Sequence, residues 1–142
     1  MENINGVLFR QMLINGSNLL ANKKGEIDAL NVFPVPDGDT GTNMSMTFTN
    51  GVKEILKVEH SDVCDIAKVL SRGLLMGARG NSGVILSQIF RGFSQAVEGM
   101  KEINGFQLAN AFFNGSRVAY KAVMRPVEGK MCIRDRWIVM KK

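Results

Sequence analysis

Cysteine, histidine and tryptophan are scarce in this chain of 142 residues, which contains two cysteines, one histidine and one tryptophan. Cys64 and Cys132 lie too far apart in the sequence to suggest a disulfide framework, and we expect Cys64 to be a buried thiol on an apolar helical face. His60 is expected in an exposed turn between two helices rather than at a catalytic centre. A reducing environment is therefore the expected one.

Long apolar runs and targeting signals are also missing. No segment approaches the roughly 18 consecutive apolar residues of a membrane span. The first residues lack the basic start and apolar run of a signal peptide. We therefore expect a cytoplasmic protein with no membrane span.

Positive charge is concentrated at one end of the chain. The formal net charge is +5, but residues 130–142 alone contain five basic residues and one acidic residue, so the rest is nearly neutral. Because nucleic-acid binding needs a basic stripe or groove, we expect no nucleic-acid partner. A Walker P-loop, Gly-x-x-x-x-Gly-Lys-Ser/Thr, is absent as well.

What the chain does contain is helical periodicity. Hydrophobic residues make up 45% of the sequence, and no β-like alternation is sustained in the first 125 residues. The sequence predicts an all-α fold of about five helices. They are expected at residues 3–22 and 42–57, from a cap at Ser61 or Asp62 to about 76, from a glycine-rich opening at 77–83 to about 99, and at 107–124.

Several details of these helices are open to a structural test. The first helix is predicted to end at Asn22–Gly25, and the fifth at Arg125–Pro126. Phe112 and Phe113 are expected in the core. The apolar face expected for the first helix comprises Ile4, Val7, Leu8, Met12, Leu19 and Leu20. Ser61 or Asp62 is expected to cap the third helix, and Asn81 or Ser82 the fourth.

Residues 31–44, NVFPVPDGDTGTNM, form the most informative segment. Two prolines favour an extended approach, and two carboxylates follow, Asp37 and Asp39. Carboxylate oxygen suits Mg²⁺, which usually takes further ligands from phosphates. Small polar residues then open a helix, whose free N–H groups favour anions: Thr40, Gly41, Thr42 and Asn43. The segment predicts a loop for a metal and a phosphate.

This segment also has three alternative interpretations. A plain Asp/Gly/Thr turn between two helices is one of them. An EF-hand would need a short polar ligand at its fifth position and glycine at its sixth, where this chain has Gly41 and Thr42. A phosphatase of the haloacid dehalogenase type places Asp-x-Asp-x-Thr after a buried strand, which the two prolines disfavour.

A second glycine-rich segment, residues 77–88, also opens a helix. Gly80, Asn81 and Ser82 can present backbone N–H groups and a hydroxyl to a phosphate, and Arg79 could add charge. A glycine-rich connector between two helices is the alternative. Because two polar, glycine-rich loops precede two helices, we favour an anion-binding role for each loop.

With these residues in view, the chain resembles the N-terminal DhaL-like domain of bacterial fatty acid kinase, a relative of dihydroxyacetone kinases. The resemblance spans residues 1–129 and is carried by residues 31–44, by residues 73–88 (GLLMGARGNSGVILSQ) and by residues 119–129 (AYKAVMRPVEG). Residues 130–142 continue no pattern and are interpreted as foreign to the domain, with a genuine basic tail as the alternative.

The resemblance implies an antiparallel barrel of about eight amphipathic helices, of which about five lie within this chain. It further implies ATP and Mg²⁺ at one end, with Asp37 and Asp39 as metal ligands and the loop around Gly80, Asn81 and Ser82 at the phosphates. Fatty acid kinases phosphorylate a fatty acid that a separate DegV-like carrier protein holds. The implied partners are therefore that carrier and ATP, with a homodimer of the full-length protein left open.

One departure from the pattern bears on the substrate. Dihydroxyacetone kinases have a third aspartate where this chain has Val32, which favours the fatty-acid branch over glycerone kinase. Asn31 is the nearest oxygen donor and is taken as the third metal ligand, with Asp28 the nearest carboxylate. No catalytic base is evident, which fits a carboxylate acceptor. A nucleotide-binding or interaction module without activity remains the alternative from another class.

Overall fold

The structure is a computed structural model that describes residues 3–30, 38–59 and 61–130, with side chains described up to residue 122. Its described residues form five α-helices and no strand, which confirms the all-α prediction. The helices are α1 (Gly6–Ala29), α2 (Thr40–Leu56), α3 (Val63–Met76), α4 (Gly80–Ala96) and α5 (Gly105–Lys130).

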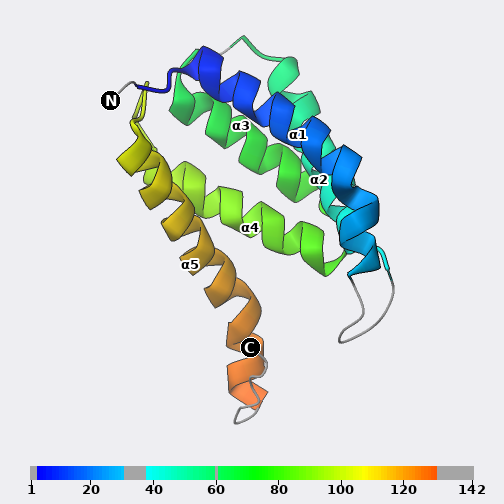
Figure 1. The fold of residues 1–142 in the computed structure, drawn as a ribbon. Helices are drawn as coiled ribbons and strands as arrows, with labels where there is room; N and C mark the ends of the chain where they lie inside the picture. The colour runs from blue at the N-terminus through cyan, green and yellow to red at the C-terminus, as the bar shows by residue number, and fades with distance from the viewer. Residues whose placement is uncertain (1–2, 31–37, 60, 131–142) are drawn as a thin grey trace.

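Helices that follow one another in the chain pack side by side (Figure 1). The packed pairs are α1 with α2, α2 with α3, α3 with α4, and α4 with α5; α2 also contacts α4, and α1 makes a smaller contact with α3. The C-terminal part of α5 extends beyond the other helices. Four helix ends therefore lie at one end of the bundle: the C-termini of α1 and α3 and the N-termini of α2 and α4.

The opposite end is held by backbone pairing between distant segments. Ile4 and Ile103 form an isolated antiparallel bridge, in which each N–H donates to the other carbonyl at 2.6 and 3.0 Å. The N–H groups of Val63 and Cys64 donate to the carbonyls of Lys101 and Met100, both at 3.0 Å. The segment before α5 thus joins the starts of α1 and α3.

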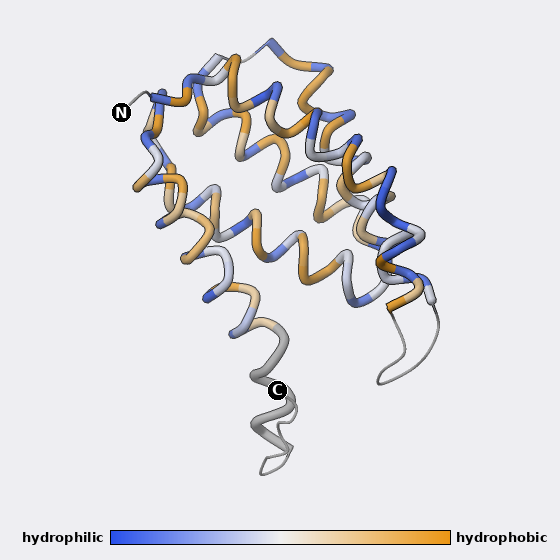
Figure 2. The backbone as a smooth tube through the Cα atoms, viewed as in Figure 1, coloured by the Kyte–Doolittle hydropathy of each residue, from blue (hydrophilic) through white to orange (hydrophobic). Residues whose placement is uncertain are grey.

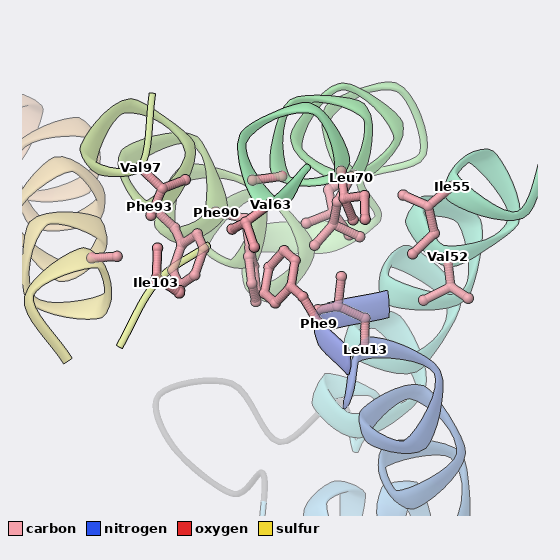
Figure 3. Close-up of a cluster of buried hydrophobic side chains, with 14 of the residues drawn as sticks. Phe9, Leu13, Val52, Ile55, Val63, Leu70, Phe90, Phe93, Val97 and Ile103 are labelled. Carbon is pink, nitrogen blue, oxygen red and sulfur yellow. The ribbon is translucent and has the colours of Figure 1, made fainter. Parts of the chain in front are cut away.

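Apolar and polar residues recur in turn along the coloured part of each helix in Figure 2, as one buried face per helix requires. The buried faces meet in a single cluster around stacked and tilted phenylalanine rings, shown in Figure 3. Phe93 is fully buried, and its ring lies 5.5 Å from that of Phe9 and 5.8 Å from that of Phe90, measured between centroids. This core aligns the helices whose ends form the candidate site.

The predicted apolar face of the first helix was only partly right. Ile4 and Leu20 pack against the core, but Val7, Leu8, Met12 and Leu19 are exposed, and Phe9 and Leu13 are buried instead. Leu8 and Met12 have the same helical spacing as Phe9 and Leu13, which lie one position further along. Periodicity within α1 therefore does not distinguish the two faces, and packing on α2 decides which one is buried. The predicted burial of Cys64 was also too high, because this thiol is only half-buried.

The predicted end of α1 at Asn22–Gly25 was wrong as well, because the helix continues to Ala29. Gly25 lies in open space, and the following turn packs tightly on α2. A Cβ on Gly41 would collide with the Lys24 carbonyl and would lie 2.8 Å from the Ile27 Cβ. Tertiary packing on α2 therefore outweighs the local stop signal.

Two further predictions failed at α5. The helix continues through Arg125 and Pro126 to Lys130, since a proline removes one backbone hydrogen bond and need not end a helix. Phe112 and Phe113 are 44% and 63% exposed rather than buried. Phe112 packs edge-on against Phe90 and Phe93, but Phe113 lies on the outer side of α5.

Candidate functional site

The glycine-rich connection between α3 and α4 lies along the first three turns of α2. It runs antiparallel to that helix and meets four of its polar residues, each about one turn from the next. Gly77 lies against Asn50, Arg79 against Thr47, Gly80 against Asn43, and Ser82 against Thr40. The two loops singled out in the sequence are thus brought together at one end of the bundle.

Hydrogen bonds fix this arrangement. The Arg79 N–H donates to Oγ1 of the buried Thr47 at 3.0 Å, and the Ser82 hydroxyl donates to the Thr40 carbonyl at 3.3 Å. The Asn50 side-chain amide donates to the Gly73 carbonyl at 2.7 Å, at the end of α3. Side-chain and backbone groups of α2 therefore hold both the end of α3 and the start of α4.

Three glycines allow the loop to approach α2 so closely. A Cβ on Gly80 would lie 2.5 Å from Nδ2 of Asn43, and Gly80 also has a positive φ of +67°. A Cβ on Gly77 would collide with the Asn50 side chain, and one on Gly83 with Thr47. Glycine is needed here for helix packing, in addition to any role in exposing N–H groups.

The first turn of α2 is capped from a neighbouring helix. Asp28, near the end of α1, accepts a hydrogen bond of 2.6 Å from the Thr42 hydroxyl and one of 2.9 Å from the Thr42 N–H. The N-cap residue of α2 itself, Asp39, makes no side-chain cap bond. A carboxylate from α1 therefore takes the place that an N-cap side chain usually fills.

These bonds hold the pKa of the Asp28 carboxyl below its ordinary value of 3.8. The Thr42 hydroxyl has the largest effect and the Thr42 N–H the next, because both donate to the charged form; burial opposes them. The Gly41 N–H and the Lys24 charge lower it further. Asp28 is thus a fixed negative charge at the start of α2, where a helix favours anions.

The first turn of α4 differs from that of α2. Its N-cap residue is Arg79, not Asn81 or Ser82 as predicted, and the Arg79 side chain makes no cap bond. The first N–H groups of a helix lack partners within the helix. Among the described contacts, those of Gly80, Asn81 and Ser82 therefore remain available to an anion, and all three residues are exposed or half-buried.

The predicted site residues divide into two groups. Thr40, Asn43, Gly80 and Ser82 are brought into contact, Asn81 follows Gly80 in the first turn of α4, and Gly41 and Thr42 face α1. Asp39 is exposed directly before α2. Asn31 and Asp37 lie outside the described residues, as does His60.

Three residues of this region were missed as parts of the site. Thr47 and Asn50 continue the spacing of Thr40 and Asn43 along one face of α2, so a polar stripe at helical intervals was the available signal. Asp28 was named only as a nearby carboxylate. Its pairing with Thr42 spans fourteen positions, and no local pattern indicates it.

Comparison with known families identifies the domain. The family model described as "DAK2 domain" matches residues 34–136, which include residues 34–44 of the first loop and all of the second loop. The chain belongs to the DAK2 domain family. The match passes residue 129, so a domain boundary at that residue remains a proposal. No helix in the described part of this DAK2 chain is long and apolar enough to cross a membrane.

Curated relatives of the DAK2 chain are much longer than the chain itself. An uncharacterized protein of Staphylococcus epidermidis is 54% identical over 129 residues, which cover 91% of this chain and 23% of the relative. Protein YloV of Bacillus subtilis is 52% identical over 129 residues, with the same coverage. An uncharacterized protein of Staphylococcus aureus is 54% identical and is covered to 24%. The chain thus spans about a quarter of these relatives.

Proposed function

We propose that this domain binds Mg²⁺–ATP as part of a cytoplasmic kinase. The observation that carries the proposal is the contact between the starts of α2 and α4, through Asn43 with Gly80 and Thr40 with Ser82. One helix start lacks a side-chain cap and can accept phosphate, and the other follows a carboxylate. An anion site beside a metal-binding carboxylate is what a magnesium nucleotide needs.

The two helix starts are assigned different roles. The N–H groups of Gly80, Asn81 and Ser82 are proposed to bind phosphate oxygens, since nothing among the described side chains caps them. The start of α2 already has the Asp28 carboxylate, which disfavours a second anion there. Thr40 and Asn43 hold the α4 loop in place, and Gly41 and Thr42 hold α2 on α1.

The residues present fit a magnesium ion. Asp39 offers an exposed carboxylate at the start of α2, and Asp37 and Asn31 offer further oxygen ligands in the segment outside the described residues. When bound, Mg²⁺ would offset the charge of carboxylates and phosphates and stabilise the transferred phosphoryl group. The protein's own contribution is to hold these ligands and the N–H groups of α4 in position.

The proposed acceptor is the carboxylate of a fatty acid held by a DegV-like carrier protein. Val32 stands where the triose-specific branch has an aspartate, and no catalytic base is evident. An ionised carboxylate needs no base, whereas a triose hydroxyl does. Glycerone kinase activity is therefore the second candidate. Whichever of the two activities is correct, it is proposed for the longer protein, in which the remaining helices would complete the barrel.

The experiment uses the full-length protein, with D39N as the test variant and E98Q as the control. Glu98 is an exposed carboxylate at the opposite end of the bundle, just after α4. We expect D39N to lose magnesium-dependent ATP binding, measured by calorimetry, and E98Q to keep it. Unchanged binding by D39N would overturn the metal assignment, and no binding by the wild type would favour an interaction module.

A second assay separates the two kinase branches. The protein is incubated with Mg²⁺–ATP and either dihydroxyacetone or a DegV-like carrier loaded with fatty acid, and ADP release is followed. We expect ADP only with the loaded carrier. ADP release with the triose alone would show that glycerone kinase is the correct branch.

A further inference from the structure

We propose that Asp28 is a positioning residue that acts through Thr42: it fixes the first turn of α2, and with it Asp39, relative to α1. The inference rests on the proposed function, in which Asp39 binds Mg²⁺. Asp28 itself is assigned no contact with metal or nucleotide.

The geometry favours positioning because both oxygens of the Asp28 carboxylate are used within the protein. Oδ1 accepts the Thr42 N–H at 2.9 Å, and Oδ2 accepts the Thr42 hydroxyl at 2.6 Å. Such a two-point contact fixes orientation as well as distance, and bonds to an ionised acceptor are stronger than neutral ones. Asp28 thus holds one residue of α2 by two atoms.

The packing around this contact also restricts the position of Asp39, the proposed metal ligand. Gly41 has no Cβ and lies directly on the Lys24 carbonyl of α1. The Asn43 N–H donates to the Asp39 carbonyl at 2.8 Å, so the backbone of Asp39 is tied to the turn that Asp28 holds. A rotation of that turn would move the Asp39 carboxylate, because Asp39 directly precedes it.

A nucleotide-free measurement tests the contact independently of the proposed function. Amide hydrogen exchange is measured in the wild type, in D28N and in E26Q. Glu26 is the matched control, because it is an exposed carboxylate of the same helix that pairs with Lys23 and not with α2. We expect faster exchange at Gly41 and Thr42 in D28N alone, by roughly five- to tenfold, as for a lost helix cap. Faster exchange throughout α2 would indicate a general loss of stability and would overturn the positioning role.

A double-mutant cycle then tests whether Asp28 acts through Thr42. The Mg²⁺ concentration needed for half-maximal ATP binding by the full-length protein is measured for D28N, T42V and D28N/T42V. We expect each single variant to need roughly tenfold more Mg²⁺, and the double variant to need no more than the worse single one. T42S keeps the hydroxyl, so we expect it to need the same Mg²⁺ concentration as the wild type.

The outcomes separate the inference from the proposed function. Additive effects, or a Mg²⁺ requirement that changes in D28N but not in T42V, would make Asp28 a metal ligand and overturn the inference. An unchanged Mg²⁺ requirement in D28N, beside a wild type that binds Mg²⁺–ATP, would overturn it too. A wild type that binds no Mg²⁺–ATP would overturn the proposed function, and with it this role of Asp28, even if the exchange result confirms the cap.

Discussion

Arg10 and Asp28 lie on the same helix, α1, and bind opposite ends of its antiparallel neighbour, α2. The Arg10 guanidinium donates to the carbonyls of Ile55 and Val58, at 3.1 and 2.8 Å, where α2 ends. Asp28 accepts from Thr42, where α2 begins. A positive group at the C-terminus and a negative group at the N-terminus match the dipole of α2. Side chains of α1 thus form hydrogen bonds with polar groups at both ends of α2.

Replacing Arg10 by alanine should destabilise the domain. The variant leaves the Ile55 and Val58 carbonyls without their charged donor, which is expected to cost about 1.5–3 kcal/mol in free energy of unfolding. The measurement is urea unfolding followed by circular dichroism. K53A is the control, because exposed Lys53 contributes positive charge to the last turn of α2 but donates none of the hydrogen bonds described there. Equal losses in both variants would show that the charge matters and the bonds do not.

The cap at the other end of α2 should make stability depend on pH. The pKa of Asp28 is lower in the folded protein than in the unfolded chain, where it is close to 3.8. Its stabilising contribution is therefore fully present above that value and is lost as the pH falls through the folded pKa.

The corresponding measurement compares the wild type with D28N by urea unfolding between about pH 6 and pH 2.5. The difference in unfolding free energy should be constant at the upper end of this range and should narrow below the ordinary pKa of Asp28. A difference that stays constant down to the lowest pH would contradict the assignment of the low pKa to this group.

Gly80 and Gly99 allow strain and contact to be measured separately. Both have a positive φ, +67° and +80°, but only Gly80 has a close neighbour, Asn43, whereas a Cβ on Gly99 would meet open space. An L-residue in this conformation costs about 1–2 kcal/mol, so G99A should lose about that much. G80A should lose more, because the new Cβ also displaces Asn43. Thermal unfolding of both variants measures which one loses more stability. Equal losses would show that the Asn43 side chain does not lie against Gly80.

Phe93, inside the aromatic cluster, and Phe113, outside it, should respond differently to truncation. Phe93 is fully buried between Phe9, Phe90 and Phe112, so F93A should cost about 3–5 kcal/mol of unfolding free energy. Phe113, at 63% exposed, should cost less than about 0.5 kcal/mol when changed to alanine. Chemical unfolding of F93A and F113A provides the comparison. A large loss in F113A would mean that its ring is covered in solution.

Periodicity in the sequence was sufficient to predict the number and type of the helices but not which side of an edge helix is buried. α2, α3 and α4 pack on helices at both sides, so their apolar faces are broad and easily recognised. α5 packs on α4 alone among the described helices, and α1 packs mainly on α2 with a smaller contact to α3, so both the inward Phe9 and the outward Val7 fit a helical pattern. The same reason explains why Phe113 was expected in the core.

The loop sequences indicated the candidate site, whereas the contacts that build it could not be predicted. Gly80 and Ser82 were recognised because glycine and small polar residues before a helix are a local signal. The partners of these residues come from α2, and the partner of Thr42 comes from α1. Such pairings depend on how the helices pack, which spacing along a single helix does not determine.

The bridge between Ile4 and Ile103 has a consequence for the order in which the chain folds. It joins the segment before α1 to the segment before α5, so roughly a hundred residues must be closed into a loop, and closure over that length is slow compared with forming any one helix. The bridge can persist only when the four intervening helices are in place. The amide protons of Ile4 and Ile103 therefore report on assembly of α1 to α4, whereas those inside α1 or α5 report on one helix alone.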